Sequence, residues 1–439
     1  MQRLGWYADA VNARSTVVVV GGGIAGLAAA RRLHDAGIDT VIVEARDRLG
    51  GRIWTAPLGD GLHVELGATW IHRTIGNPIA SLAAGLPTIP TDYDNGTIYG
   101  PDGRELSDRH QEAIEDAFDS LLEGVAALRT RQAGGPDQSL QEAIDELTAG
   151  KDRQRRRELA YAVNVEIEHD YAADAADLSL FYWNQDEEFA GLDVLLPGGY
   201  AAIIDRLADG LAVRRGRVTH VVSTDDGVAL TTETGILSAR LAIVTVPLGV
   251  LKAGSVTFDP PLPPPHVAAL GRLGVGTLDR AVFLFPEVFW DEDYDLFGWI
   301  GPEPGLWAEW FGMQRASGAP ILVGFNAGSM ADRVARWTDS AIVNSALAAL
   351  ETMLGRKPPP PRAVALTRWR ADPFAGGAYS HIPPGASGSD YDTLATPPSE
   401  RLILAGEHTS RAYPGTVHGA FLSGERAARD ALAALERIG

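Results

Sequence analysis

Residues 15–27 read STVVVVGGGIAGL, a run of β-branched residues followed by three glycines and the start of an apolar pattern. The run Ser15–Val20 is typical of a buried parallel strand. Apolar side chains then recur over Ile24–Ala36 with the period of a helix. Thr40–Val43 reads as a second buried strand, closed by Glu44. A strand, a helix and a strand in this order predict an α/β fold with a parallel sheet.

The glycines Gly21, Gly23 and Gly26 fit the G-x-G-x-x-G spacing of dinucleotide-binding turns. In such a turn the first glycine permits a tight bend, the second lets the backbone approach a pyrophosphate, and the third lets helix and strand pack closely. The N-terminus of the helix adds N–H groups and partial positive charge. Glu44 stands 18 residues after Gly26, where a carboxylate can accept hydrogen bonds from an adenosine ribose. The pattern therefore predicts a bound dinucleotide.

A second loop that is rich in arginine and glycine follows directly, with Arg46, Arg48, Gly51 and Arg52. A basic loop beyond the ribose-binding acid suits a longer ligand such as FAD. Two alternatives are a solvated surface loop and a site for the 2′-phosphate of NADP. The carboxylate of Glu44 would repel that phosphate, which disfavours NADP.

Composition excludes several classes of protein. The chain has 439 residues, of which 45% are hydrophobic and 22% charged, and this usage is that of a globular protein. It has no cysteine, so disulfides, thiolate metal sites and cysteine nucleophiles are excluded. The net charge of −19 argues against a nucleic-acid partner and favours cationic substrates. We find no apolar run of about 20 residues and no signal-peptide core, so we expect no membrane partner and a cytoplasmic location.

The pattern changes along the chain. Ser107–Arg131 and Ser139–Tyr171 are long, polar and patterned as helices. Strand patterns return later in the chain, with two more helices. The expected strands are Arg217–Val222, Val228–Thr232, Leu241–Val246, Thr277–Phe285, Ile321–Phe325 and Leu402–Ala405, and the expected helices are Ala341–Leu354 and Val417–Arg437.

Several long motifs, in order from about Val17 to Ala431, closely resemble the flavin-containing amine oxidases. Within that family the chain is most similar to polyamine oxidases and to the catalytic domain of lysine-specific histone demethylases. We expect neither the additional N-terminal domain nor the helical insertion of the demethylases, so histone demethylation is not carried over. The motifs are VEARDRLGGR (43–52), ELGATWIH (65–72), TVPLGVLK (245–252), RWRADP (368–373), GAYS (377–380), AGEHT (405–409) and YPGTVHGA (413–420).

The resemblance implies an α/β amine-oxidase architecture of two domains. A doubly wound, Rossmann-like FAD-binding domain would be assembled from residues 1–85, 195–255 and 398–439. A second, α+β substrate domain would comprise residues 86–194 and 256–397. The flavin ring would lie where the two domains meet.

The resemblance also implies which residues bind FAD. Glu44 and Arg46 would hold its adenosine side and Arg52 its pyrophosphate. Thr416 and Val417, at the start of the last helix, would stabilise negative charge on the reduced flavin. The remaining residues expected to contact FAD are Gly21, Gly23, Gly26, Gly51, Thr69, Trp70, Val218 and Glu407.

Four aligned positions bear on the chemistry. Trp369 and Tyr379 match aromatic residues beside the flavin, although Trp369 could instead be a core residue. Ala378 stands where monoamine oxidases have the cysteine that is bonded to FAD, so non-covalent FAD is expected. Thr416 stands where many relatives have a second aromatic residue, so only half of an aromatic cage is expected.

Arg280 stands where the family has a lysine that holds a water molecule at the flavin and assists reoxidation by oxygen. An arginine keeps the charge but cannot act as a proton shuttle. Oxygen reactivity would then be slow, or another acceptor would serve. The alternative is a barrel-facing or surface arginine with no role in catalysis.

Two groups of residues are candidates for substrate contacts. His72 matches a histidine that lies near the substrate nitrogen in animal polyamine oxidases, and a buried structural histidine is the alternative. Asp186, Glu187 and Glu188 match an acidic cluster at the mouth of the family's cavity, where they would attract ammonium groups; an exposed turn is the alternative. Glu166 and Glu168 are weaker candidates of the same kind. We expect no metal ligand, since H-E-x-x-H and cysteine are both absent.

These observations predict an FAD-dependent oxidase that takes a hydride from a polyamine or diamine. The imine would be hydrolysed, and molecular oxygen would reoxidise the flavin to give hydrogen peroxide. The alternatives are an oxidase of a hydrophobic or cyclic monoamine, a flavin dehydrogenase that uses another acceptor, and a flavin-holding scaffold without turnover. The sequence does not specify the oligomeric state.

Overall fold

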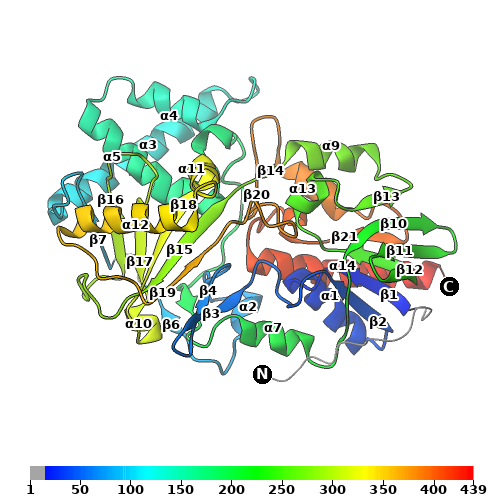
Figure 1. The fold of residues 1–439 in the computed structure, drawn as a ribbon. Helices are drawn as coiled ribbons and strands as arrows, with labels where there is room; N and C mark the ends of the chain where they lie inside the picture. Colours follow the sequence, from blue (N-terminus) through cyan, green and yellow to red (C-terminus); the bar gives the residue numbers. More distant parts are fainter. Residues whose placement is uncertain (1–14, 92, 94, 439) are drawn as a thin grey trace.

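The larger sheet of this computed structural model, which describes residues 15–438 except 92 and 94, contains both strands predicted at the start of the chain (Figure 1). Its strand order is β13-β10-β11-β12-β1-β2-β9, and β21 also pairs with β12. The strands β9, β2, β1, β12 and β21 pair in parallel, as predicted. The eight strands are β1 (Ser15–Val20), β2 (Thr40–Glu44), β9 (Ala212–Arg215), β10 (Val218–Thr224), β11 (Gly227–Thr232), β12 (Gly235–Val244), β13 (Thr257–Asp259) and β21 (Leu402–Leu404).

Alternate residues of these strands build two separate cores, because successive side chains of a strand point to opposite faces. Val17 and Val19 belong to one core, whose helices are α1 (Ile24–Asp35), α2 (Pro78–Leu82), α7 (Ala201–Ala208) and α14 (Val417–Arg437). Val18 and Val20 belong to the other, whose helices are α8 (Leu248–Lys252), α9 (Pro264–Arg272) and α13 (Gly388–Ala395). The sheet is therefore covered on both faces, as in doubly wound folds.

A second, mainly antiparallel sheet has the strand order β19-β15-β18-β17-β16-β7. One face packs on α11 (Gly328–Val334) and α12 (Asp339–Leu354), and the other packs on the hairpin of β3 (Thr55–Gly59) and β4 (Leu62–Glu65). The strands of this sheet are β7 (Gly96–Tyr99), β15 (Leu278–Leu284), β16 (Leu296–Trp299), β17 (Glu309–Gly312), β18 (Ile321–Ala327) and β19 (Ala363–Leu366).

The helical middle of the chain forms its own core beside the second sheet, on the far side from α1 and α14 (Figure 1). The predicted segment Ser139–Tyr171 is not one helix but four elements. The connection between α4 and α5 ends at Asp152, which caps α5: its carboxylate accepts a hydrogen bond from the Arg155 N–H at 2.9 Å. The elements of this core are α3 (Asp108–Arg131), α4 (Leu140–Thr148), α5 (Arg153–Val163), a π-helix (Asn164–Glu168) and α6 (His169–Tyr171).

Short elements complete the fold and join the two sheets. They are β5 (Trp70–Ile71), β6 (Ile89–Pro90), β8 (Val194–Leu195), β14 (Gly274–Val275), β20 (Ser380–His381), α10 (Gln314–Ser317) and the 3-10 turns Ala175–Asp177 and Glu407–Thr409.

Among the residues that the structure describes, no helix is both long and apolar enough to span a bilayer. The predicted cytoplasmic location stays a prediction.

The expected domain boundaries do not follow the packing everywhere. The strand β13 pairs with β10, and α9 and α13 pack under the larger sheet, although we expected residues 256–397 in the second domain. The hairpin of β3 and β4 packs on the second sheet, although we expected it in the first domain. The resemblance implied these boundaries, but the sheet that each segment joins is decided by tertiary contacts that the motifs do not specify.

Helix α14 lies so close to α1 that a side chain at Gly424 would collide with the carbonyl oxygen of Ala25. Gly424→Ala should lower the free energy of unfolding by about 2 kcal/mol, as overpacking does. The matched control is Gly271→Ala in α9, where a Cβ would meet no atom within 4 Å. That change should stabilise by about 0.5–1 kcal/mol, the helix preference for alanine. Urea unfolding midpoints measure both, and equal effects would contradict this packing.

Candidate active site

A cavity with a volume of about 750 Å3 runs from the larger sheet to the second sheet. The β1–α1 turn and Glu44 line one end. Glu166, Asp170 and Glu309 line the other. The predicted cofactor and substrate residues therefore share one space, although they come from segments that lie far apart in the sequence.

The turn between β1 and α1 leaves room for backbone only. Gly21 has a φ of 105°, and a Cβ on Gly26 would collide with the carbonyl oxygen of Gly21. A Cβ on Gly23 would meet only the Gly50 carbonyl oxygen, at 3.9 Å, so the space beside Gly23 is open to the cavity. This is the close approach that a pyrophosphate needs at a helix N-terminus.

Glu44 is buried beside this turn. Its carboxylate accepts hydrogen bonds from the N–H of Gly22 at 2.6 Å and of Arg46 at 2.7 Å. Burial raises the pKa of Glu44, and these two hydrogen bonds oppose the rise. Each oxygen keeps a further lone pair for a ligand hydroxyl, so its place suits the expected ribose contact.

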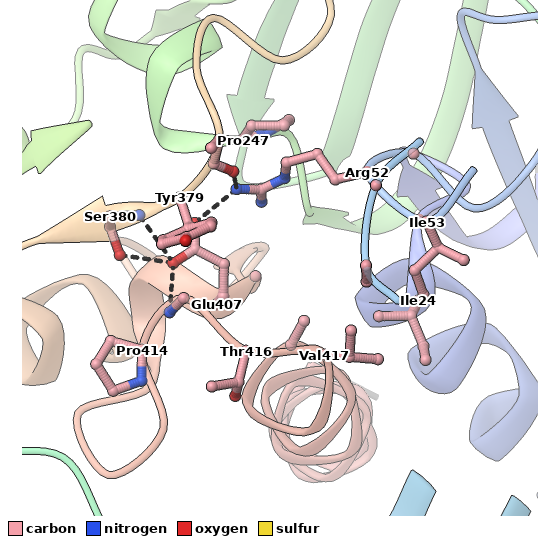
Figure 2. A pocket seen from close by; sticks show the side chains of 18 of the residues that line it. Ile24, Arg52, Ile53, Pro247, Tyr379, Ser380, Glu407, Pro414, Thr416 and Val417 are labelled. Carbon is pink, nitrogen blue, oxygen red and sulfur yellow. Dashed lines mark hydrogen bonds and ion pairs between the residues drawn. The ribbon is translucent and has the colours of Figure 1, made fainter. Parts of the chain in front are cut away.

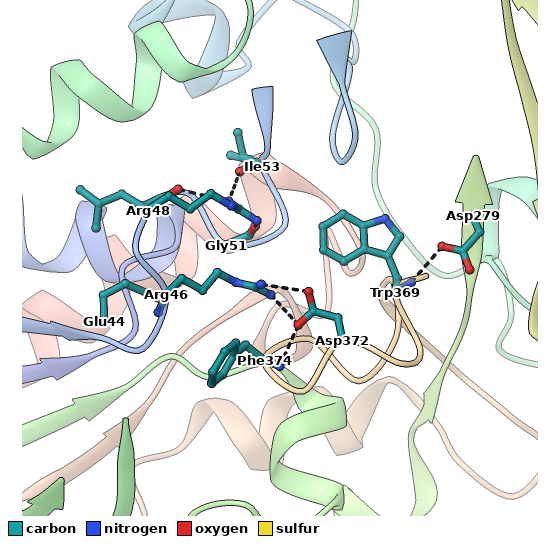
Figure 3. Close-up of polar contacts among 10 residues, drawn as sticks. Glu44, Arg46, Arg48, Gly51, Ile53, Asp279, Trp369, Asp372 and Phe374 are labelled. Carbon is teal, nitrogen blue, oxygen red and sulfur yellow. Dashed lines mark hydrogen bonds and ion pairs between the residues drawn. The ribbon is translucent and has the colours of Figure 1, made fainter. Parts of the chain in front are cut away.

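Arg46 lines the cavity, but its guanidinium is already engaged. Arg46 forms two hydrogen bonds with Asp372, at 2.9 and 2.8 Å, and lies over the ring of Phe374 (Figure 3). Arg48 donates to the backbone carbonyls of Gly51 and Ile53 in the same loop. These arginines fix the shape of the loop, a role that sequence reasoning did not predict.

An ion pair between Arg52 and Glu407 connects a segment from the first part of the chain with a segment from the last part. Arg52 donates to Glu407 at 2.9 Å and to the carbonyl of Ala378 at 2.7 Å (Figure 2). The other Glu407 oxygen accepts from the Ser380 hydroxyl at 2.6 Å and the Gly415 N–H at 3.0 Å. Burial acts to raise the pKa of Glu407, but Arg52 and the other partners outweigh it and hold the pKa below its usual value.

The expected aromatic residues line the middle of the cavity. The Trp369 indole N–H donates to the Leu66 carbonyl at 3.2 Å, and its backbone N–H donates to Asp279 at 2.9 Å (Figure 3). The Tyr379 hydroxyl donates to the His169 carbonyl at 2.7 Å. Trp369 is therefore buried and also lines the cavity. The two alternatives given for it, a core residue and an aromatic residue beside the flavin, do not exclude each other.

Thr416 caps α14. Its hydroxyl accepts from the Gly419 N–H at 2.9 Å and donates to the Tyr413 carbonyl at 2.9 Å. Thr416 and Val417 line the cavity, so the positive end of the helix dipole opens on it (Figure 2). The cavity is also lined by Gly51, Thr69, Trp70 and Val218, as expected for cofactor contacts.

Arg280 is buried, so it is not a surface arginine. It donates to the Thr69 hydroxyl at 2.6 Å and to the Glu65 carbonyl at 3.1 Å, and its guanidinium lies over Phe325. Burial lowers the pKa of Arg280 to about 10, with Glu65 opposing, so it stays a cation at neutral pH. Its Nε has no hydrogen-bond partner in the protein.

His72 is not the buried structural histidine that was the alternative to a substrate contact. Half of its side chain is exposed, it lines the cavity, and its Nδ1 lies 2.6 Å from Asp193. Sequence reasoning missed Asp193, which is nearly buried and lies outside every motif that we recognised.

The three predicted acidic residues line the cavity and are exposed. Asp186 accepts from the Tyr171 hydroxyl at 2.9 Å, and Glu188 lies 3.4 Å from Arg73 in an ion pair. The backbone N–H of Glu187 donates to the Ala412 carbonyl at 2.6 Å. The segment is therefore exposed and held by these contacts, so both the cavity contact and the exposed turn remain open.

The far end of the cavity is more acidic than predicted. Glu166, Asp170 and Glu309 face it together, whereas the carboxylate of Glu168 is bound to the Asn164 side chain and the Ala175 N–H. Asp170 is exposed to the cavity but shielded from bulk water. This burial raises its pKa to about 7, helped by Glu166 and Glu309 and opposed by His72.

The residues present fit FAD. The carboxylate of Glu44, the open cradle at Gly23 and the start of α14 suit its ribose, its pyrophosphate and its ring, in that order. Arg280 lines the same cavity, and its Nε is a buried donor without a protein partner. Among the described residues, no group of three or more His, Asp or Glu side chains has the arrangement that a metal ion requires.

The chain is similar to known proteins over nearly its whole length. The family pattern described as Flavin containing amine oxidoreductase matches residues 24–432. The chain is 37% identical to Lysine-specific histone demethylase 1 homolog 2 of Oryza sativa subsp. japonica over 96% of this chain, but it spans only 57% of that protein. It is 34% identical to Polyamine oxidase 2 of Arabidopsis thaliana, over 97% of this chain and 89% of that protein.

A solved structure of putrescine oxidase bound to putrescine has the same fold, with a TM-score of 0.79. The match covers 96% of this chain and 99% of that chain, at 22% sequence identity. The family match spans almost the whole chain, and the polyamine oxidase match spans most of both proteins. The chain belongs to the flavin-containing amine oxidoreductase family, so its cofactor is a flavin.

Proposed function

We propose that the chain oxidises a polyamine or diamine, with molecular oxygen as the electron acceptor and hydrogen peroxide as a product. The observation that carries this proposal is the acidic far end of the cavity, which Glu166, Asp170 and Glu309 line. A substrate with two ammonium groups could leave one there while the other reaches the aromatic wall.

FAD, when bound, supplies the hydride acceptor at N5. The Gly23 cradle, Glu44, Arg52 and the start of α14 would hold it. Ala378 lines the cavity where a linking cysteine would stand, and the chain has no cysteine, so FAD would be held without a covalent bond.

The chain's own residues would orient the amine and keep water away. Trp369 and Tyr379 form a wall against which the carbon chain can pack, and the Tyr379 hydroxyl is tied to the backbone of α6. Burial of the reacting nitrogen favours its uncharged form, which is the form that can be oxidised. The distal ammonium stays charged because carboxylates surround it.

A second candidate is a dehydrogenase that uses an acceptor other than oxygen. The observation that favours it is Arg280, whose guanidinium is fixed by Thr69 and Glu65 and keeps its proton. A lysine could exchange a proton with a water molecule there, whereas an arginine cannot.

An amine panel tests the proposed function directly. Under anaerobic conditions a diamine or polyamine should bleach the flavin absorbance near roughly 450 nm. Monoamines of equal length should act more slowly, because they leave the acidic end unpaired. A flavin that no amine bleaches would identify a scaffold and overturn the proposal.

The acceptor is tested by Arg280→Lys, with oxygen and an artificial acceptor compared. Reoxidation by oxygen should accelerate by about 100-fold, the lower range of acid–base contributions. The rate with the artificial acceptor should change little, which serves as the internal control. An unchanged oxygen rate would contradict the role given to this position.

Asp170→Asn tests the acidic end. The pKa of Asp170 is raised to about 7, so its carboxylate gains charge as the pH rises through neutrality. Diamine affinity should therefore increase between about pH 6 and about pH 8 in the unaltered protein and lose this step in the variant. At the upper pH the variant should bind a diamine about tenfold more weakly, but a monoamine equally well. The dissociation constant from anaerobic flavin reduction measures this, and an equal loss for both amines would exclude a distal site.

A further inference from the structure

The segment that carries two carboxylates of the acidic far end is not an ordinary α-helix. Between α5 and α6 the chain forms a π-helix over Asn164–Glu168. The backbone N–H of His169 donates to the Asn164 carbonyl, five residues earlier, whereas an α-helical N–H donates to the carbonyl four residues earlier. Single turns of this kind are rare and are frequent at functional sites.

The π-helix decides which side chains of this segment face the cavity. An α-helix turns by about 100° per residue, so in an unbroken α-helix Glu166 and Asp170 would each lie within about 20° of Leu159, a residue of the helical core. Ile167 would lie about 80° away from Leu159. The structure has the opposite arrangement, because Ile167 packs in that core while Glu166 and Asp170 line the cavity. The longer turn therefore keeps two carboxylates out of an apolar core and directs them into the cavity.

Side chains from the two ends of the π-helix hold it together. The Asn164 amide donates to one oxygen of Glu168 at 2.8 Å, and the other oxygen accepts from the Ala175 N–H at 2.9 Å. Asn164 is buried, and its own Oδ1 has no hydrogen-bond partner in the protein. Glu168, a weaker candidate for a substrate contact in the sequence, is not one of the described residues that line the cavity. Its carboxylate therefore serves the turn.

The end of the π-helix is also joined to the rest of the cavity through His169. The His169 carbonyl accepts from the Tyr379 hydroxyl at 2.7 Å, and its Nδ1 lies 3.0 Å from Glu309. A shift of the helix by one residue would break both contacts. The register of this short turn therefore also sets how the acidic end lies relative to the aromatic wall.

We propose, on the basis of the proposed function, that Asn164 and Glu168 are positioning residues that lock the π-helix, and that the π-helix holds Glu166 and Asp170 where the distal ammonium of a diamine binds. Glu168 acts through the two hydrogen bonds that it accepts and not through its charge. The preference for a substrate with two amino groups therefore depends on a residue that does not touch the substrate.

Two substitutions of Glu168 separate positioning from charge. Glu168→Gln removes the charge but can keep both contacts: its amide oxygen can accept from the Ala175 N–H, and its amide nitrogen can donate to the unpaired Oδ1 of Asn164. Glu168→Ala removes both contacts. The matched control is Asp145→Ala, because Asp145 accepts from the Gln141 amide at 2.8 Å, four residues earlier, on the ordinary helix α4.

The measurements are the dissociation constant and the limiting rate of anaerobic flavin reduction, for a diamine and for a monoamine of equal length. In Glu168→Ala the diamine should bind about tenfold more weakly, the lower range for a hydrogen bond to a charged group. The monoamine affinity and the limiting rate should change little. Glu168→Gln and Asp145→Ala should both match the unaltered protein.

Two results would overturn the inference. Equal losses of diamine affinity in Glu168→Gln and Glu168→Ala would assign the effect to the charge of Glu168. Equal losses for the diamine and the monoamine in Glu168→Ala would indicate a general structural defect. If Glu168→Ala does not fold, Asn164→Ala decides, because it removes the same contact from the other end and should weaken only the binding of the diamine.

The proposed function fails separately. If the unaltered protein binds the diamine no more tightly than the monoamine, the proposed function is wrong, and this inference falls with it. If the unaltered protein prefers the diamine and Glu168→Ala keeps that preference, only the inference is overturned.

Discussion

The rest of the structure depends on the close approach of backbone to backbone at the β1–α1 turn. Gly26 lies against the Gly21 carbonyl, and α14 lies against α1 through Gly424. Any side chain at these points would push the helices away from the larger sheet. The same closeness leaves the space beside Gly23 open, so one steric constraint shapes both the core and the cofactor cradle.

Buried charge is the second feature that links fold and chemistry. Arg46 with Asp372, and Arg52 with Glu407, connect residues that are 326 and 355 positions apart in the sequence. Both pairs are only partly buried, so forming either one adds little net stability, whereas removing one partner leaves the other charge unpaired. These pairs therefore specify which segments meet around the cavity, and the cofactor residues of the first and last motifs come together there.

Sequence reasoning predicted those features whose cause is local. The glycine turn, the valine strand and the helix Val417–Arg437 follow from neighbouring residues, and all three are confirmed. Asp193, Asp170 and Glu309 were missed, because their roles arise from tertiary contacts between segments that carry no recognisable spacing. The ion pair of Arg46 was missed for the same reason: its partner, Asp372, lies in another motif, and no pattern links the two.

The flavin content of Gly23→Ala tests the central claim most directly. Gly23 has φ −74° and ψ 175°, which alanine adopts without strain, and an added Cβ meets no protein atom closer than 3.9 Å. The unaltered protein should release about one FAD per chain on denaturation, as a single non-covalent site requires. Gly23→Ala should unfold at the same denaturant concentration, measured without FAD, yet bind FAD at least about tenfold more weakly. Equal FAD affinity in the two proteins would contradict this account.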